Sequence, residues 1–487
     1  MPGLTPLSRA AKDGNEEVVR MLLERGDVDP SAADEHGRTP LFIAACEGHE
    51  GVVKILLGWN DITFSTATLF GAPLVGDQGI AEMQLERKKV DPNTVDEAGR
   101  TPLFIAARKG HKGVVKMLLE HNDVNPNIGN EDGQTPLFIA ARAGYGLIVK
   151  MLLEHVDTNP NLSDYNGEIP LFVAASKGHG GVVKRLLSRE DVNPNTVNGY
   201  GETALAIAAR NGREGVIKVL VNCEDVNPNT THQLWGQTPL FIAADRGHKG
   251  VVKILLGRMD LNPNTTDRSG RTPLSIAAHN GHKEVVRMLL ERNDVDPDAT
   301  DRVETPLLEA AREQHEEIME MLLENVGVNP NAVGVLGRTL LFLAAGQGYG
   351  RVVKMLLARD DVDPNTRDAF GQTPLFKAAH EGHQEVVKML LKRSDINPNV
   401  PDDRRNTAFL TAVSEGHVGV VKILLERADV NSDIRGLTGA RVIVEARKRG
   451  HDALVKLLSE HRSLPPRLFG DPNQPPSKRC RRICFQG

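Results

Sequence analysis

The residues of this sequence that are best suited to chemistry are histidines that recur at one place. They are His49, His111, His179, His248, His282, His383, His417 and His451. Imidazole nitrogen is a common zinc ligand, so such a row could hold metal ions. Each histidine, however, follows a glycine and begins the same predicted helix. Neighbouring copies would lie about 10 Å apart, as packed helices do, whereas zinc bonds are about 2 Å long. We therefore predict a structural role for these histidines and no metal.

A second pattern, Asp123–Asn127, begins like a calcium-binding loop. Such a loop needs a glycine at its sixth position, where the chain turns sharply, and a glutamate at its twelfth position, which holds the ion with two oxygens. The sequence has Ile128 and Gln134 at these positions. A calcium loop is therefore excluded.

No other motif with a recognised chemistry occurs. The chain lacks the glycine-rich phosphate cradle that ends in Lys-Ser or Lys-Thr, and no serine or cysteine lies in a nucleophile motif. Four cysteines, Cys46, Cys223, Cys480 and Cys484, are too few and too scattered for a disulfide framework, which favours a reducing compartment. We predict that the protein is not an enzyme and binds no cofactor.

The elements that carry these residues belong to a repeat. The segment Thr101–Ala107 recurs as Thr135–Ala141, a step of 34 residues. Matching repeats begin at residues 5, 39, 101, 135, 169, 203, 238, 272, 305, 339, 373, 407 and, weakly, 438. A fixed period over most of the chain indicates an array of small repeats rather than one central core.

Each repeat is predicted to form two short helices and a turn. In the repeat that begins at Thr39, this threonine caps the first helix, Pro40 suits its first position, and Gly48 ends it. His49 begins a second helix with Val52, Val53, Leu56 and Leu57 on one apolar face. An Asp-Val-Asn-Pro-Asn connector follows, which its proline keeps extended. The pattern Asp-x-x-Gly-x-Thr then predicts a projecting turn.

This repeat resembles the ankyrin repeat, a turn and two helices that carry the motif T-P-L-H-x-A. The likeness extends from Thr5 to about His461, and the connector is similar to those of the ankyrin arrays of filamentous fungi. The resemblance implies an all-α repeat solenoid of about 13 helix-turn-helix units with projecting β-turn fingers. It also implies that the first helices line a concave face beside the fingers.

Phenylalanine replaces the family's histidine after Thr-Pro-Leu. It does so at Phe42, Phe104, Phe138, Phe172, Phe241, Phe342 and Phe376. In the family this histidine ties the turns together by hydrogen bonds, so the resemblance leaves open how the tie is made here. We expect a buried row of phenylalanines that replaces hydrogen bonding by packing, rather than a ligand groove.

Three segments depart from the period of the predicted array, 1–461. Residues 62–89 are inserted between the second and third repeats; we expect disorder, with a binding arm or a retained segment of the gene as alternatives. The repeat at 305 has a shortened turn and carries Glu309 in place of isoleucine, which resembles a cap. This predicts a softer or differently curved seam at 299–309, with ordinary repeat drift as the alternative. The proline-rich, basic tail 462–487 is predicted to be disordered.

Positions that vary between repeats map the expected binding surface. Just before the Gly-His pair, the third to seventh repeats carry a basic row, opposed only by Asp245: Arg108, Lys109, Arg142, Lys177, Arg210 and Arg246. Three successive finger tips carry Tyr165, Tyr200 and Trp235 beside Leu234. Aromatic residues and arginine dominate interface hot spots. We predict that an acidic or amphipathic protein segment binds across 142–246, with a solvated charged face as the alternative. Val335, Leu336 and Phe370 form a weaker second patch.

Composition narrows the functional classes. The net charge of -5 and the pI of about 6.4 do not favour direct binding of nucleic acid. Neither a secretory signal nor an apolar stretch long enough for a membrane span occurs. We therefore predict a monomeric, cytoplasmic, non-catalytic scaffold or adaptor for protein–protein interaction. The alternative is a nuclear regulatory, transcription-associated ankyrin protein that is imported through the basic cluster Lys478–Arg482.

Overall fold

The computed structural model describes residues 4–25, 27–59, 89–299, 304–325, 327–432, 444 and 446–460. The insertion predicted at 62–89 lies outside these residues except for residue 89. The tail 462–487, residues 300–303 of the predicted seam, and the start of the weak repeat at 438 also lie outside them. The chain divides into two compact units, Met1–Asp267 and Arg268–Gly487, and each is described by itself.

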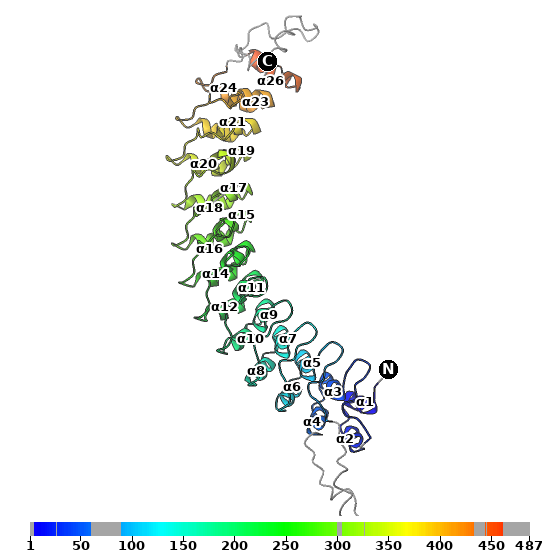
Figure 1. Ribbon diagram of the computed structural model, residues 1–487. Coiled ribbons are helices and arrows are strands. Elements are labelled where there is room, and N and C mark those ends of the chain that lie inside the picture. Colours follow the sequence, from blue (N-terminus) through cyan, green and yellow to red (C-terminus); the bar gives the residue numbers. More distant parts are fainter. Residues whose placement is uncertain are drawn as a thin grey trace, which may run out of the picture. The chain divides into compact units, whose positions relative to one another are not determined.

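The first unit contains two short helices in each repeat. First helices pack against first helices of the neighbouring repeats, and second helices against second helices (Figure 1). The first helices are α1 (Pro6–Asp13), α3 (Pro40–Glu47), α5 (Pro102–Lys109), α7 (Pro136–Ala143), α9 (Pro170–Lys177), α11 (Ala204–Arg210) and α13 (Pro239–Asp245). The second helices are α2 (Glu16–Glu24), α4 (Glu50–Gly58), α6 (Lys112–Leu119), α8 (Gly146–Glu154), α10 (Gly180–Leu186), α12 (Glu214–Val221) and α14 (Lys249–Leu256).

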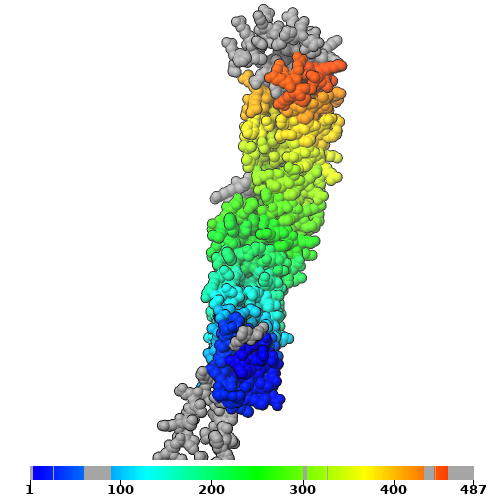
Figure 2. All heavy atoms as spheres, turned by 90° about the vertical axis from the view of Figure 1, so that its right-hand side faces the viewer, coloured from blue at the N-terminus to red at the C-terminus, as the bar shows by residue number. Residues whose placement is uncertain are grey.

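The second unit repeats this arrangement. Its first helices are α15 (Pro273–His279), α17 (Pro306–Arg312), α19 (Leu340–Gln347), α21 (Pro374–Glu381) and α23 (Ala408–Glu415). Its second helices are α16 (Lys283–Leu290), α18 (Glu316–Glu324), α20 (Gly350–Leu357), α22 (Gln384–Leu391), α24 (Val418–Leu425) and α26 (Asp452–Glu460), and the short 3-10 turn η2 (Val335–Gly337) lies in one finger. Within each unit, every repeat forms a band beside the repeats next to it in sequence (Figure 2). The predicted all-α repeat solenoid is confirmed.

Local sequence explains where the helices begin and end. The Thr39 Oγ1 accepts the Phe42 amide at 3.2 Å, and Pro40 occupies the first turn of α3. Gly48 ends this helix with φ 82°, a left-handed conformation that suits glycine. The predicted cap, proline and stop are therefore confirmed.

The core is a row of apolar side chains shared between neighbouring repeats. The seven phenylalanines that take the place of the family's histidine are at most 4% exposed, as the predicted packing row requires. The apolar face of each second helix is buried as well. Helices of two or three turns are marginal on their own, so burial against the next repeat supplies their stability.

In many repeats the Gly-His pair joins the repeat to the one before it. The His111 Nε2 donates to the Cys46 carbonyl at 3.0 Å, and His417 makes the same bond to His380 at 2.9 Å. A Cβ on Gly48 would lie 2.8 Å from the His111 Nδ1, closer than real side chains approach. The imidazole therefore fits only over a glycine. This is the structural role that we predict for the recurrent histidines.

Many connectors are joined to the next by an asparagine. The Asn127 Nδ2 donates to the Asp157 carbonyl at 2.6 Å, and its Oδ1 accepts the Asn159 amide at 2.9 Å. We call this pair of bonds the asparagine clamp. The same two bonds are made by Asn93, Asn195, Asn229, Asn365 and Asn399. Because one amide satisfies a donor and an acceptor of the next connector, the clamp holds the two connectors in register.

The clamp is incomplete at Asp298, which takes the position of the asparagine. Its Oδ2 accepts the Asn329 amide at 2.6 Å. Its Oδ1 is buried and has no hydrogen-bond partner among the described residues. An ionised carboxylate has no hydrogen to donate, so the bond to a carbonyl of the next connector is missing. Burial raises the pKa of Asp298; the bond from the Asn329 amide opposes this, and the charge of Asp296 adds to it.

Glu309, which makes the repeat at 305 resemble a cap in sequence, is buried in the structure. Its side chain is only 4% exposed and lies 3.0 Å from the His279 Nδ1 and 3.7 Å from Arg312. Arg312 also pairs with the carboxylate of Glu304. The helix α17 packs between α15 and α19. Glu309 is therefore an inner residue of the stack, held by His279 and Arg312, and not a cap.

Candidate functional site

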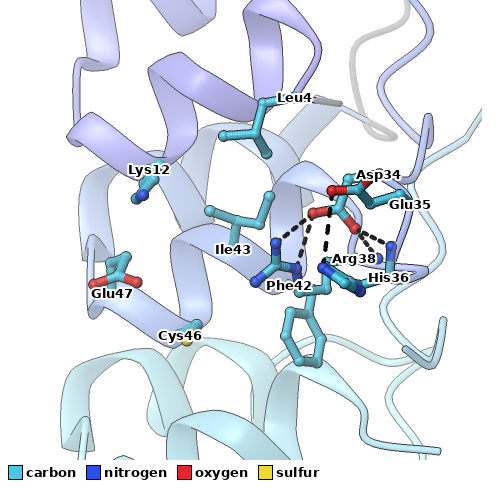
Figure 3. Close-up of a pocket in the computed structure, with 10 residues that line it drawn as sticks. All are labelled: Leu4, Lys12, Asp34, Glu35, His36, Arg38, Phe42, Ile43, Cys46 and Glu47. Atoms are coloured by element: carbon cyan, nitrogen blue, oxygen red, sulfur yellow. Dashed lines mark hydrogen bonds and ion pairs between the residues drawn. The ribbon is translucent and has the colours of Figure 1, made fainter. Parts of the chain in front are cut away.

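The fingers are tight turns built on an aspartate. The Asp96 Oδ1 accepts the amides of Ala98 and Arg100 at 3.1 and 2.9 Å. Asp34 holds the preceding finger in the same way, and the Arg38 guanidinium folds back onto its carboxylate (Figure 3). This geometry confirms the predicted Asp-x-x-Gly-x-Thr turn.

Backbone hydrogen bonds join successive fingers. The Glu131 amide donates to the Ala98 carbonyl at 3.1 Å, and the Tyr165 amide to the Asp132 carbonyl at 3.0 Å. In the family a histidine links the turns by hydrogen bonds, and phenylalanine replaces it here. These backbone bonds link the turns instead. The tips of these three fingers, up to that of Tyr165, are consequently held one repeat apart.

Three successive tips present aromatic side chains to solvent. Tyr165, Tyr200, Leu234 and Trp235 are between 60% and 81% exposed. Each aromatic ring therefore keeps most of its contact area available. The structure places Tyr165, Tyr200 and Trp235 on neighbouring fingers of the same unit, where one partner could cover all three.

The predicted basic row lies at or just beyond the carboxyl ends of the first helices. All six side chains are exposed: Arg108, Lys109, Arg142, Lys177, Arg210 and Arg246. A cation at this end of a helix interacts favourably with the helix dipole. The row thus has a structural benefit as well as the capacity to attract carboxylates.

The six cations differ in how far they are already neutralised. Arg210 lies 2.5 Å from the Glu202 carboxylate, whose side chain is only 3% exposed. Arg246 lies 3.7 Å from Asp245. The other four have no carboxylate within ion-pair distance among the described residues: Arg108, Lys109, Arg142 and Lys177. These four are available to a partner without the loss of an existing pair.

The contacts of two carboxylates in the aromatic fingers, Glu168 and Glu202, could not be predicted from the sequence. The Glu168 Oε1 accepts the Asn198 side-chain amide at 2.7 Å, which links one finger to the next. The Asn198 Oδ1 accepts the amides of Tyr200 and Glu202, each at 3.0 Å. Burial raises the pKa of Glu168; the bond from Asn198 opposes this, and the neighbouring carboxylates add to it.

A groove of about 350 Å³ lies beside the finger of the repeat that begins at Thr39 (Figure 3). Lys12 faces it together with the acidic Glu35 and Glu47. Glu47 occupies the position that Lys109 holds in the next repeat. The basic row therefore begins only at α5, and this groove is not a continuation of it.

Within the described ranges, no helix combines the length and the apolar character that crossing a membrane requires. In the same ranges, no group of three or more His, Cys, Asp or Glu side chains is arranged to hold a metal ion.

Comparison with known proteins identifies the repeat. A family model described as ankyrin repeats in three copies matches residues 2–66, 72–164, 148–232, 223–301, 294–368 and 341–435. No curated protein matches the sequence. Among solved structures, the chain is similar to the ankyrin repeat domain of Bcl-3, described as a unique member of the IkappaB protein family. That likeness has 24% identity and a TM-score of 0.40, and covers 46% of this chain and 99% of that one. It concerns the fold alone.

Proposed function

Because the chain belongs to the ankyrin-repeat family, whose arrays serve as non-catalytic scaffolds for protein–protein interaction, we propose that its first unit binds a partner protein. The bound segment is acidic or amphipathic and lies along the finger tips and the ends of the first helices between residues 142 and 246. The protein is a scaffold or adaptor that acts as a cytoplasmic monomer. It binds partners through the finger tips and the concave face, without a cofactor or nucleic acid.

The observation that carries this proposal is the combination of exposed rings and unpaired cations in one unit. Burying a large apolar side chain contributes about 1.5–3 kcal/mol, and three rings lie on adjacent fingers. Arg142 and Lys177 can accept a carboxylate at no cost to an existing pair. Arg210, in contrast, would first have to leave Glu202, so we expect it to contribute less than these two.

The aromatic tips are tested by replacing Tyr165, Tyr200 and Trp235 with serine. A matched control replaces three other exposed apolar residues of the same unit, Leu147, Val156 and Met259, with serine. Partners are identified by affinity purification and mass spectrometry, and the dissociation constant is then measured with the purified partner. We expect the first variant to lose the partner and the control to keep it. Equal retention by both variants would remove the tips from consideration.

The charges are tested by replacing Lys109, Arg142 and Lys177 with glutamate. The control replaces Lys184 and Lys218, exposed lysines on the second helices α10 and α12. For an acidic segment, charge reversal should weaken binding by about 10- to 100-fold and remove its salt dependence, because complementary charges are lost. Unchanged or tighter binding would contradict an acidic partner.

The cytoplasmic location is tested with a fluorescent fusion of the full chain. Deletion of the basic cluster Lys478–Arg482 should leave its distribution unchanged. Movement from the nucleus to the cytoplasm on deletion would instead support the nuclear regulatory alternative.

A further inference from the structure

The second unit carries its own exposed tips on three successive fingers. Val335, Leu336 and Phe370 are between 45% and 57% exposed. The next finger ends in Arg404 and Arg405, which are both exposed. We call these five residues the second-unit tip patch. It combines an apolar surface with two adjacent cations.

The fingers of this patch are held together by their backbones. The Ala369 amide donates to the Leu336 carbonyl at 2.7 Å, and the Asp403 amide donates to the Phe370 carbonyl at 3.1 Å. Leu336 and Phe370 therefore lie one finger apart, and Arg404 follows one finger further. A single extended segment can contact all three in order.

Backbone strain is concentrated in this patch. Leu336 has φ 62°, and Arg405 has φ 66° where the preceding finger has Gly371. This left-handed region costs free energy for side chains other than glycine, asparagine and aspartate. Two of the three non-glycine residues with positive φ in the described chain belong to the patch. Leucine at a strained, solvent-exposed position benefits neither the turn nor the core, which is the pattern of a functional contact.

The charges beside the patch leave its two arginines unmatched. A groove of about 510 Å³ next to Phe370 is lined by both cations and carboxylates. The carboxylate of Asp403 lies 3.4 Å from Arg367, and that of Glu415 lies 2.8 Å from Arg449. Within the described ranges, no carboxylate lies at ion-pair distance from Arg404 or Arg405. Both guanidinium groups can therefore pair with a carboxylate of a partner without the loss of an existing ion pair.

We propose that the second-unit tip patch is a separate docking surface for an extended peptide segment of a partner protein. In this segment an apolar or aromatic side chain is followed closely by a carboxylate. The apolar side chain covers Leu336 and Phe370, and the carboxylate pairs with Arg404 or Arg405. Together with the first-unit site, this surface makes the chain bivalent, able to hold two segments at once.

The probe is a phage-displayed library of random 12-residue peptides, selected on the purified full chain. Peptides in which an apolar residue stands within a few positions of Asp or Glu should be enriched. Synthetic copies are then titrated against Leu336→Asn and Phe370→Ser by fluorescence anisotropy. Each substitution should weaken binding at least tenfold, whereas Trp235→Ser should leave it unchanged.

Leu336→Asn separates docking from folding. Asparagine tolerates a left-handed backbone better than leucine, so the melting temperature of this variant should be equal to or higher than that of the wild type while its affinity falls. Arg405→Gly should likewise keep or raise the melting temperature and lower the affinity for the acidic peptides.

Three results would overturn the proposal. They are no enriched peptide, enriched peptides that lack carboxylates, and binding that Leu336→Asn and Phe370→Ser leave unaltered. Peptides that respond only to Trp235→Ser would assign binding to the first unit, which would reject this second surface and leave the first-unit proposal intact.

Discussion

Two connectors of the second unit differ by one polar group at the same position. Asn365 donates to the Asp395 carbonyl at 2.8 Å and accepts the Asn397 amide at 2.7 Å. Asp298 makes only the second kind of bond, to Asn329. The comparison teaches that the complete clamp needs an amide, which is both donor and acceptor. A carboxylate of nearly the same shape makes only one of the two hydrogen bonds.

The largest expected effect is that of Asn365→Ala, which removes both bonds of a complete clamp. With about 0.5–1.5 kcal/mol for each hydrogen bond, the connector should lose about 2 kcal/mol of local stability. Hydrogen exchange of peptides that cover residues 394–399 measures it. The matched variant Asp298→Ala removes one bond and should lose less than half as much. Equal losses would show that the clamp does not work through two bonds.

Asn365→Asp should convert the complete clamp into the incomplete one. It loses the donor and leaves a partly buried carboxylate oxygen without a partner, which costs about 1–2 kcal/mol at pH 7. Because a protonated carboxyl can donate again, the loss should shrink as the pH falls towards 4. A loss that is the same at both pH values would contradict this account.

The reverse change, Asp298→Asn, should stabilise the connector by about 1 kcal/mol at pH 7. The pKa of Asp298 is raised in the folded chain, so folding favours its protonated form. The stability that this carboxyl contributes is present below its ordinary pKa and is lost as the pH rises through the raised pKa. The advantage of the variant should therefore vanish in acid, and hydrogen exchange over residues 327–332 at pH 7 and pH 4 checks this.

The smallest effect is expected in the first unit, where Glu168 links two fingers. Glu168→Gln keeps the oxygen that accepts the Asn198 amide and removes a charge close to Asp164 and Glu202. Since the pKa of Glu168 is raised by folding, its ionised form weakens the fold above that pKa. The variant should gain about 0.5 kcal/mol at pH 7, after allowance for solvent screening, and nothing in acid. Urea unfolding of the full chain at pH 7 and in acid measures this change in the free energy of unfolding.

The repeat architecture could be predicted because its signals are local and recur. Thr39, Pro40 and Gly48 act within one helix, and the apolar positions act through their spacing. The sequence also indicates that Asn127 recurs, but not what its amide contacts, because the partner atoms lie in the next repeat. Recurrence alone does not reveal a bond between repeats.

The positions of the candidate site residues could be predicted from the sequence, but which of its cations are already paired could not. The exposure of Tyr165 and Trp235 follows from their place in a turn. The neutralisation of Arg210 by Glu202 does not, because the two side chains come from different elements and meet only when the finger folds back to the helix end. The burial of Glu309 could not be predicted for the same reason, since its partner His279 belongs to another repeat.

The histidine that reaches back and the asparagine that reaches forward give the repeats interchangeable ends. A repeat that carries both can follow, or be followed by, a copy of itself, since the glycine and the connector that it needs are present in every such copy. Recombination of the gene in whole repeats therefore lengthens or shortens the array without inventing a new junction. Selection for new partners then acts on the finger tips and on the residues just before the Gly-His pair.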